Sequence, residues 1–208
     1  MARLRRTRRL LLLAGALACH TAAFAADVTV VVRDDKGRPV KDAVVILNGP
    51  AEHPPEPGHF VINQKDMTFI PFVLVVPVGS TVDFGNLDPF RHHVYSFSPA
   101  KKFELKLFGQ GQMRPVRFDK PGIVAIGCNI HDSMQAFIQV VDTPFAARSG
   151  ANGRVLLRGI PDGAQSVRVW HPQLRAPGNQ LTIAVKASGN VTLPVTVKLR
   201  PQAPHTMY

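Results

Sequence analysis

The stretch that decides the fold reads Cys128-Asn-Ile-His131-Asp-Ser-Met134. It offers a thiolate, an imidazole and a thioether at intervals of three residues, so one tight loop can wrap all three around a single ion. Thioether sulfur rarely binds zinc, whereas two histidines and a cysteine in a trigonal arrangement, with a distant methionine, are the ligands of blue-copper sites. The loop therefore predicts a copper site, with one more histidine supplied from elsewhere in the chain.

The second histidine is expected in the upstream stretch Asn86-Leu-Asp-Pro-Phe-Arg-His92-His93-Val94. A turn and a strand, residues 78 to 86, lead into this stretch. Neighbouring residues on a strand face opposite ways, so His92 and His93 cannot easily reach the same ion. The alternation of apolar residues does not choose between them, because the large rings that follow share a face with His93. The spacing alone leaves both histidines open.

Most of the remaining sequence is typical of β-strands. Short runs rich in β-branched or aromatic residues are expected to form strands at 28–32, 43–47, 72–76, 81–84, 94–97, 123–126, 137–141, 167–170, 181–185 and 191–199. Turn-forming residues separate these runs, as in Asp35-Lys36-Gly37 and Pro161-Asp162-Gly163. No window carries a helical period, and 18 prolines argue against long helices. The sequence therefore predicts an all-β protein built of sandwiches.

Taken together, these motifs resemble the cupredoxin family of copper proteins. The family pattern V-x-x-G-x-x-V-x-F-x-N-x-D is followed by H-x-V, P-G and C-x-x-H-x-x-M in the family's order, over about residues 67 to 141. The short spacing from Cys128 to Met134 is similar to that of amicyanins, which serve methylamine dehydrogenase. The resemblance implies a Greek-key sandwich that holds copper.

The same resemblance implies which residues bind the metal. The expected ligands of one type 1 copper ion per chain are His92, Cys128, His131 and Met134. His92 is preferred because it stands in the H-x-V motif. His93 stands where the family often has asparagine, and we expect it to form a hydrogen bond beside the site, where such partners orient ligands.

The two ends of the chain resemble complementary halves of a second module. Residues 28 to 45 resemble the opening of a carboxypeptidase-regulatory-like sandwich, and residues 151 to 170 resemble its remainder. The sequence therefore predicts a small β-sandwich, residues 27–49 plus 143–200, interrupted by a copper domain at 59–142. Three prolines in residues 51 to 58 are typical of a stiff linker, and residues 201–208 are expected to form a tail. Two unrelated β appendages are the alternative.

The first 25 residues have the pattern of a signal peptide. Five arginines precede an apolar run, and Ala23-Phe24-Ala25 fits the rule for cleavage after Ala25. A retained membrane anchor and a lipoprotein modified at Cys19 are the alternatives, and the export route can be either general or twin-arginine. We therefore predict a periplasmic protein without a transmembrane segment after cleavage.

Cleavage also changes the cysteine count and the charge. It leaves Cys128 as the single cysteine, which cannot form an internal disulfide and is therefore expected to be buried or bound to an ion. The loss of five arginines lowers the net charge from +11 to +6. No basic stripe suggests nucleic acid, whereas a moderately basic surface suits an acidic partner protein.

These observations predict a protein that carries single electrons between redox partners of the cell envelope. No general acid/base pair or open coordination position is visible, so we predict that the chain is not an enzyme. Cys128 lies between Gly127 and Asn129, not between the two histidines that multicopper oxidases have there. Copper binding and trafficking, or a structural module stabilised by copper, are the alternative functions.

Overall fold

The computed structural model describes residues 26–49, 53–161, 163–187 and 189–201. Their regular elements are all strands apart from one short 3₁₀ turn, Pro177–Asn179, which confirms the all-β class. The predicted signal peptide, residues 1–25, and all but the first residue of the predicted tail lie outside this description. None of the described residues forms a helix long and apolar enough to cross a membrane.

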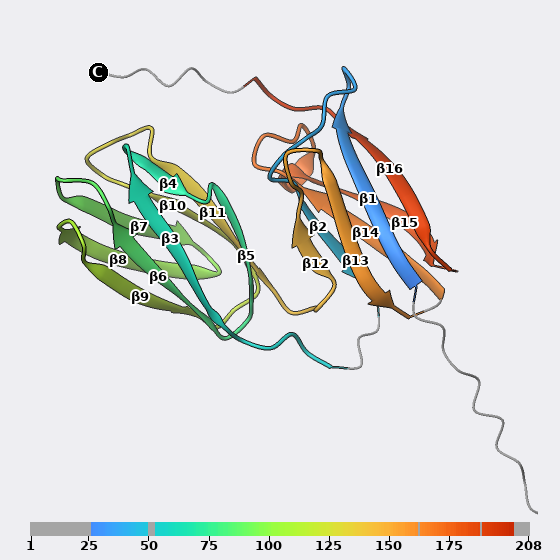
Figure 1. The fold of residues 1–208 in the computed structure, drawn as a ribbon, viewed down its shortest axis with the longest axis horizontal. Coiled ribbons are helices and arrows are strands. Elements are labelled where there is room, and N and C mark those ends of the chain that lie inside the picture. The colour runs from blue at the N-terminus through green and yellow to red at the C-terminus, as the bar shows by residue number, and fades with distance from the viewer. Residues whose placement is uncertain (1–25, 50–52, 162, 188, 202–208) are drawn as a thin grey trace, which may run out of the picture.

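The middle of the chain forms one sandwich, called here the inner sandwich. One sheet has the strand order β4-β3-β6-β9, and the facing sheet has the order β5-β11-β10-β7-β8 (Figure 1). The strands are β3 (His59–Lys65), β4 (Thr68–Ile70), β5 (Val73–Pro77), β6 (Ser80–Asn86), β7 (His92–Ser98), β8 (Lys101–Phe108), β9 (Met113–Phe118), β10 (Gly122–Gly127) and β11 (Gln135–Val141).

Alternating residues of these strands fill the space between the two sheets. Phe84 of β6 and Phe118 of β9 come from one sheet, and Ile138 of β11 comes from the other, and all three are fully buried. Cys128 and Met134 belong to the same buried cluster. The core of the inner sandwich therefore extends up to the predicted metal loop and fixes its base.

Strands from both ends of the chain form a second sandwich, called here the outer sandwich. Its two sheets have the orders β13-β1-β16 and β12-β2-β14-β15. The strands are β1 (Ala26–Asp34), β2 (Val44–Asn48), β12 (Ala146–Arg148), β13 (Arg154–Ile160), β14 (Gly163–Trp170), β15 (Gln180–Ala187) and β16 (Val191–Val197). In the first sheet, Val30 pairs with Val155 on one side and with Leu193 on the other. The domain boundaries and the carboxypeptidase-regulatory-like resemblance stay predictions.

Six strands of the structure, β3, β4, β8, β9, β12 and β13, were not expected from the sequence. The clearest case is β8, which reads Lys-Lys-Phe-Glu-Leu-Lys-Leu-Phe and lies at the edge of its sheet. Edge strands commonly carry lysines, which discourage pairing with other chains. β8 has no continuous apolar or β-branched run, because its outward-facing residues are charged.

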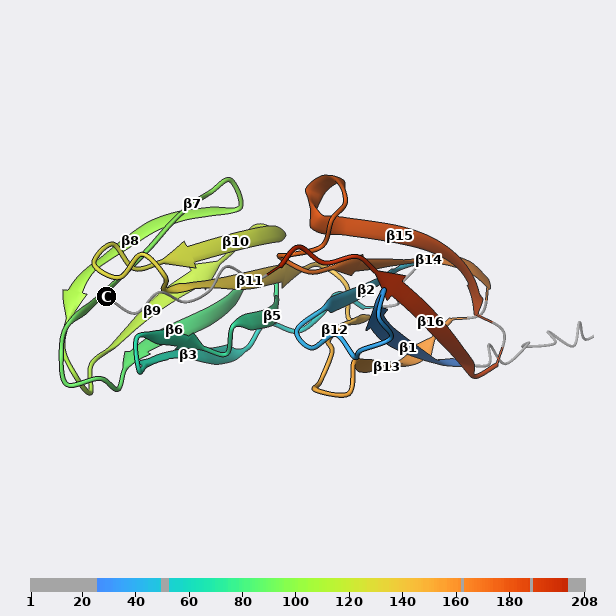
Figure 2. The same cartoon turned by 90° about the horizontal axis from the view of Figure 1, so that it is seen from above.

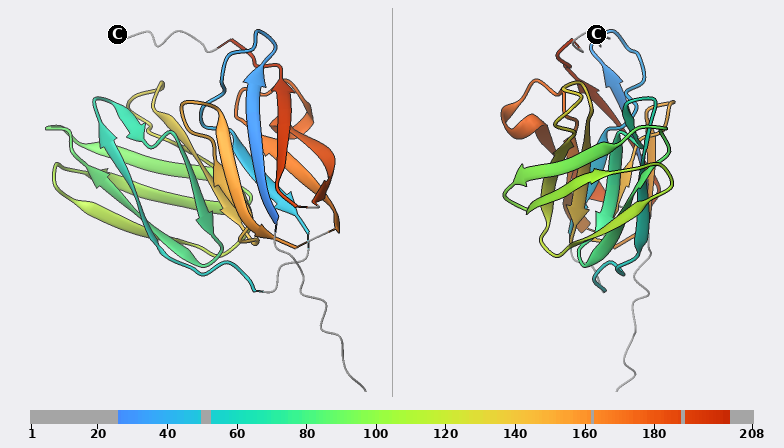
Figure 3. Two further views of the ribbon diagram at one scale, coloured as in Figure 1. Left: turned by 45° about the vertical axis from the view of Figure 1, so that its right-hand side comes forward. Right: turned by 90° about the vertical axis from the view of Figure 1, so that its left-hand side faces the viewer.

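A small third core joins the two sandwiches, which lie side by side along the long axis of the molecule (Figures 2 and 3). Trp170 of β14 is 2% exposed, and its ring centroid lies 5.5 Å from that of Phe137 on β11. Phe137 in turn meets Phe72 edge to face at 5.6 Å. The aromatic contacts tie the outer sandwich to the strand that leaves the metal loop.

A buried histidine follows Trp170 in the outer sandwich. His171 is 6% exposed, and its Nδ1 accepts a hydrogen bond from the Gln173 N–H at 3.2 Å. Burial lowers the pKa of His171, although the Asp42 carboxylate and a hydrogen bond to the Lys41 backbone act in the opposite direction. The folded protein therefore holds this imidazole neutral where an unfolded chain would already protonate it.

This difference predicts how stability depends on pH. Below the ordinary histidine pKa of 6.5 the unfolded chain binds more protons than the folded one, so the free energy of unfolding falls as pH decreases from there to the lowered pKa. His171→Asn keeps an acceptor near the position of Nδ1 and removes the titration. Urea unfolding on both sides of pH 6.5 is expected to show a smaller decrease for the variant than for the unmodified chain. Equal decreases would contradict this account of His171.

Candidate metal centre

Three of the predicted ligands come together at one end of the inner sandwich. The donor atoms of His92, Cys128 and His131 lie within 4.8 Å of one another. The Sγ of Cys128 lies 3.9 Å from the Nδ1 of each histidine. Metal bonds of about 2.3 Å to sulfur and about 2.0 Å to nitrogen, set about 120° apart, place the two donors about 3.7 Å from each other. The observed separations therefore fit one ion between the three side chains.

Two elements of the larger sheet supply these residues. His92 begins β7, and Cys128 directly follows β10, its neighbour in the sheet. The loop from β10 to β11 is closed by two backbone hydrogen bonds, from the Cys128 N–H to the Met134 carbonyl at 3.2 Å and from the Met134 N–H to the His131 carbonyl at 2.9 Å. These two bonds fix the backbone of the loop that carries the three candidate ligands.

Met134, the fourth predicted ligand, lies at the base of the loop. Its side chain is 2% exposed and belongs to the same buried cluster as Cys128. Its burial in the cluster that contains Cys128 is compatible with a weak axial ligand, which must not be turned to solvent.

A carboxylate fixes the orientation of the His92 ring. The Nε2 of His92 lies 2.7 Å from the Oδ2 of Asp88, and both side chains are almost fully buried. An ionised carboxylate only accepts hydrogen bonds, so Nε2 carries the proton. The Nδ1 lone pair is then free and points toward Cys128, which is the tautomer that a metal ligand requires.

Asp88 is held in its ionised form by several donors. Burial raises the pKa of Asp88, but hydrogen bonds from His92 and from the backbone N–H groups of Asp66 and Met67 outweigh it, so the pKa is lowered overall. The two N–H groups lie 2.7 and 3.1 Å from the carboxylate oxygens. Asp66 and Met67 have φ values of 51° and 55°, an uncommon conformation for residues other than glycine. Asp88 therefore also anchors the tight turn between β3 and β4.

Asn86 holds the segment between β6 and β7. Its side-chain amide donates to the carbonyls of Phe90 and Phe108 at 2.8 and 3.0 Å, and its Oδ1 accepts from the Asp88 N–H at 2.9 Å. All polar atoms of this buried side chain are therefore used within the inner sandwich. Through these bonds Asn86 sets the position of Asp88, and through Asp88 the position of His92.

His131 is the part of the centre nearest to solvent. Its side chain is half-buried, and burial, followed by the proximity of His92, lowers its pKa despite the opposing charge of Asp88. The neutral ring keeps a lone pair for a metal. The Phe90 ring lies 5.8 Å from that of His131, and Phe90 and Ile130, the residue before His131, are each more than 40% exposed. An apolar rim of exposed side chains thus accompanies this histidine.

His93 is not part of the group. Because β7 alternates, His93 faces away from the core of the inner sandwich, where its Nε2 lies 2.9 Å from the Oε1 of Glu104. Its Nδ1 is buried without a hydrogen-bond partner. The expected hydrogen bond beside the site is therefore made to Glu104 rather than to a candidate ligand. Asp88 makes that contact instead, and its sequence signal was the acidic residue four positions before His92.

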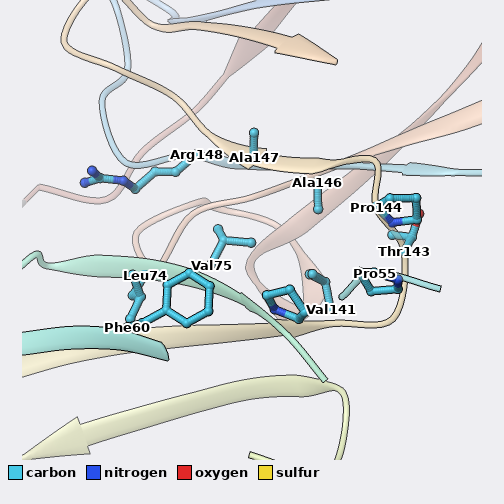
Figure 4. A pocket seen from close by; sticks show the side chains of 11 residues that line it. Pro55, Phe60, Leu74, Val75, Val141, Thr143, Pro144, Ala146, Ala147 and Arg148 are labelled. Atoms are coloured by element: carbon cyan, nitrogen blue, oxygen red, sulfur yellow. The ribbon is translucent and has the colours of Figure 1, made fainter. Parts of the chain in front are cut away.

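A separate hollow of about 360 Å³ lies at the joint between the sandwiches (Figure 4). Its lining is mostly apolar and includes Phe60, Leu74 and Val75 from the inner sandwich and Pro144, Ala146 and Arg148 from the outer one. None of the four predicted ligands lines this hollow. The candidate metal centre therefore lies apart from this hollow.

The comparison with known proteins found solved structures that resemble part of this chain. No family model and no curated protein matches the chain. A copper-containing nitrite reductase from Thermus scotoductus is 28% identical with a TM-score of 0.39, over 54% of this chain but only 28% of its own length. A purple cupredoxin from Nitrosopumilus maritimus is 22% identical with a TM-score of 0.36, over 39% of this chain and 98% of its own. A mutant amicyanin in its reduced form is 22% identical with a TM-score of 0.38, over 47% of this chain and 98% of its own.

The prediction that the chain is not an enzyme is contradicted by the first of these structures, because a nitrite reductase is an enzyme. The prediction relied on the lack of a visible acid/base pair. The lack of a visible acid/base pair is therefore no ground for excluding an enzyme, and the matched region covers only 28% of that nitrite reductase.

The role assigned to Asp88 predicts a change in metal affinity. Asp88→Ala removes both the partner of His92 and the charge beside it, so copper affinity is expected to fall by about 10- to 100-fold. Asp88→Asn keeps an acceptor and is expected to have a smaller effect. Asp132→Ala, which removes an exposed carboxylate of the same loop, is the control and should leave the affinity unchanged. Competition with a chelator measures all three variants, and an unchanged affinity in Asp88→Ala would contradict the role.

Proposed function

We propose that this chain is a type 1 copper protein that carries single electrons between redox proteins of the cell envelope. The observation that supports it is the placement of the Cys128 sulfur 3.9 Å from the Nδ1 of both His92 and His131. Met134 is buried in the same cluster as Cys128. One thiolate, two imidazoles and a weak thioether form a donor set that suits copper better than zinc, magnesium or calcium.

In this proposal the four predicted ligands have different roles. His92, Cys128 and His131 hold one copper ion per chain, and Met134 tunes it from a weaker axial position. The bound ion would supply a redox couple, Cu(II)/Cu(I), which gains or loses one electron. The chain keeps the ligands in place through the Asp88 hydrogen bond and the two backbone bonds that close the loop. A site that needs little rearrangement between its two charge states exchanges electrons with a low barrier.

The same features favour retention of the metal over its delivery to other proteins. Cys128 is 2% exposed and His92 is fully buried, so a competing ligand cannot reach them without opening the loop. A trafficking protein needs ligands that an acceptor can approach. The half-buried edge of His131, within its apolar rim, is the part of the site that a redox partner can contact directly.

The remaining parts of the proposal rest on the sequence. The pattern of residues 1–25 supports export to the periplasm, and the moderately basic chain supports acidic partner proteins. The proposed division is a copper domain at residues 59–142 inserted into a sandwich of residues 27–49 and 143–200. In the proposed arrangement the outer sandwich supports the copper domain, because Trp170 packs against Phe137 of β11.

The proposal predicts the colour of the protein and its loss. Charge transfer from the Cys128 thiolate to Cu(II) should give the loaded mature chain an intense visible band, which Cys128→Ser abolishes. His92→Ala should weaken copper binding strongly. The matched change His93→Ala, at the neighbouring residue that bonds Glu104, should keep the band. Met134→Leu should keep the colour and raise the reduction potential, because the axial ligand tunes the site.

Stopped-flow reduction by a one-electron donor, followed by transfer of copper to a chelator, separates the functions. Fast reduction with copper retained supports an electron carrier. Slow reduction with ready release of Cu(I) would contradict it and favour trafficking. A colourless loaded protein would contradict the type 1 site itself.

A further inference from the structure

A row of aromatic rings covers the outer face of β7. Phe97 is 78% exposed, the highest value for any large apolar side chain among the described residues. Its ring lies 5.3 Å from that of Tyr95, which lies 5.8 Å from that of His93. The intervening residues Val94 and Ser96 are buried on the opposite face. These three rings, called here the β7 strip, face away from the core of the inner sandwich; Phe97 is the exposed end of the strip, Tyr95 is half-buried and His93 is 5% exposed.

The β7 strip lies beyond the part of the sheet that the outer sandwich covers. On the same face, Phe137 of β11 is packed against Trp170 of the outer sandwich. Ala125, which pairs with Phe137 from β10, is already exposed. The outer face of this sheet is therefore covered by a contact near β11 and is open at Phe97 of β7. Exposed apolar side chains that continue a covered face are typical of a binding surface.

Lysines of β8 lie beside the β7 strip. Lys102 pairs directly with Phe97, and Lys106 is exposed on the same face. Among the described residues, no carboxylate lies within ion-pair distance of either lysine. Glu104, which stands between them, bonds to His93. With two lysines against the one exposed carboxylate of Glu104, the strip keeps an excess of positive charge, which favours a partner that brings acidic groups.

The strip also reaches the backbone next to the candidate metal ligand. Tyr95 pairs with Gly127, the residue before Cys128. A Cβ placed on Gly127 would lie 3.1 Å from the Cζ and Oη atoms of Tyr95, so glycine lets the ring lie against this backbone. A protein bound to the strip is thus separated from the Cys128 segment by a single aromatic ring.

We infer that the β7 strip, with Lys102 and Lys106, is a docking surface for an acidic redox protein, separate from the rim of His131. This inference rests on the proposed electron-carrier function. The apolar rings form the centre of the surface, and the lysines select a partner with carboxylates around an apolar patch. A second copy of this chain would bring the same excess of positive charge, which disfavours it as the occupant.

The test uses the mature, copper-loaded full chain and a plant-type ferredoxin as an acidic one-electron probe. Amide NMR signals of the ¹⁵N-labelled, reduced protein are followed during titration at low salt. Signals of β7 and β8 should shift or broaden. Lys102→Glu combined with Lys106→Glu should weaken binding at least about tenfold, and Phe97→Ser by about three- to tenfold.

Two matched controls lie on the outer sandwich. Lys36→Glu combined with Lys41→Glu makes the same charge change at two exposed positions, and Leu156→Ser removes an exposed apolar side chain of β13. Each should change the affinity less than about twofold. Responses confined to residues 89–91 and 130–132, no response at all, or equal decreases in the controls would overturn the inference.

The visible band distinguishes failure of the docking surface from failure of the proposed copper site. If the loaded chain shows the band but ferredoxin does not bind the strip, the docking surface fails while the copper site stands. If the loaded chain lacks the band, the proposed function fails, and so does the inference that the surface serves a redox protein.

Discussion

The buried hydrogen bond between Asp88 and His92 is the interaction on which the geometry of the candidate centre depends. It places the proton of His92 on Nε2 and leaves Nδ1 free beside the Cys128 thiol. The bond is strong because Asp88 is ionised and shielded from water, with further donors from Asp66 and Met67. Without a partner, a buried carboxylate would be costly, so the tight turn, the ligand and the Asn86 amide stabilise one another.

The sandwich fold supplies what this bond needs. β6 and β7 belong to opposite sheets, so the segment between them crosses the end of the core, where Asn86 and Asp88 are buried. β10 and β7 are neighbours in one sheet, which brings Cys128 beside His92 although 36 residues separate them. The return strand β11 then passes from Met134 to the aromatic contact with Trp170. The metal loop is thus braced by the core on one side and by the outer sandwich on the other.

The fold class and the donors of the metal loop could be predicted from local patterns in the sequence, whereas the choice of His92 over His93 came from the resemblance to the H-x-V motif. Apolar runs between turn residues identified ten strands, and the spacing of the loop identified three donors. The strand β8 could not be found in this way, because its exposed face is lysine and glutamate and only its register with β7 reveals its role. Asp88 stands in the N-x-D part of the pattern four residues before His92, but its contact with Nε2 could not be derived from that position, since a side chain on a loop has no fixed direction. The β7 strip likewise depends on which part of the sheet the outer sandwich covers.

The central claim is that one copper ion is bound by the thiolate of Cys128 and the Nδ1 atoms of His92 and His131. X-ray absorption at the copper edge of the loaded mature protein counts these ligands directly. The account predicts one short copper–sulfur bond and two copper–nitrogen bonds in both Cu(II) and Cu(I) states, with little change in length between them. A shell made only of nitrogen and oxygen, or a copper–sulfur bond that is present in the Cu(II) state and absent in the Cu(I) state, would contradict it.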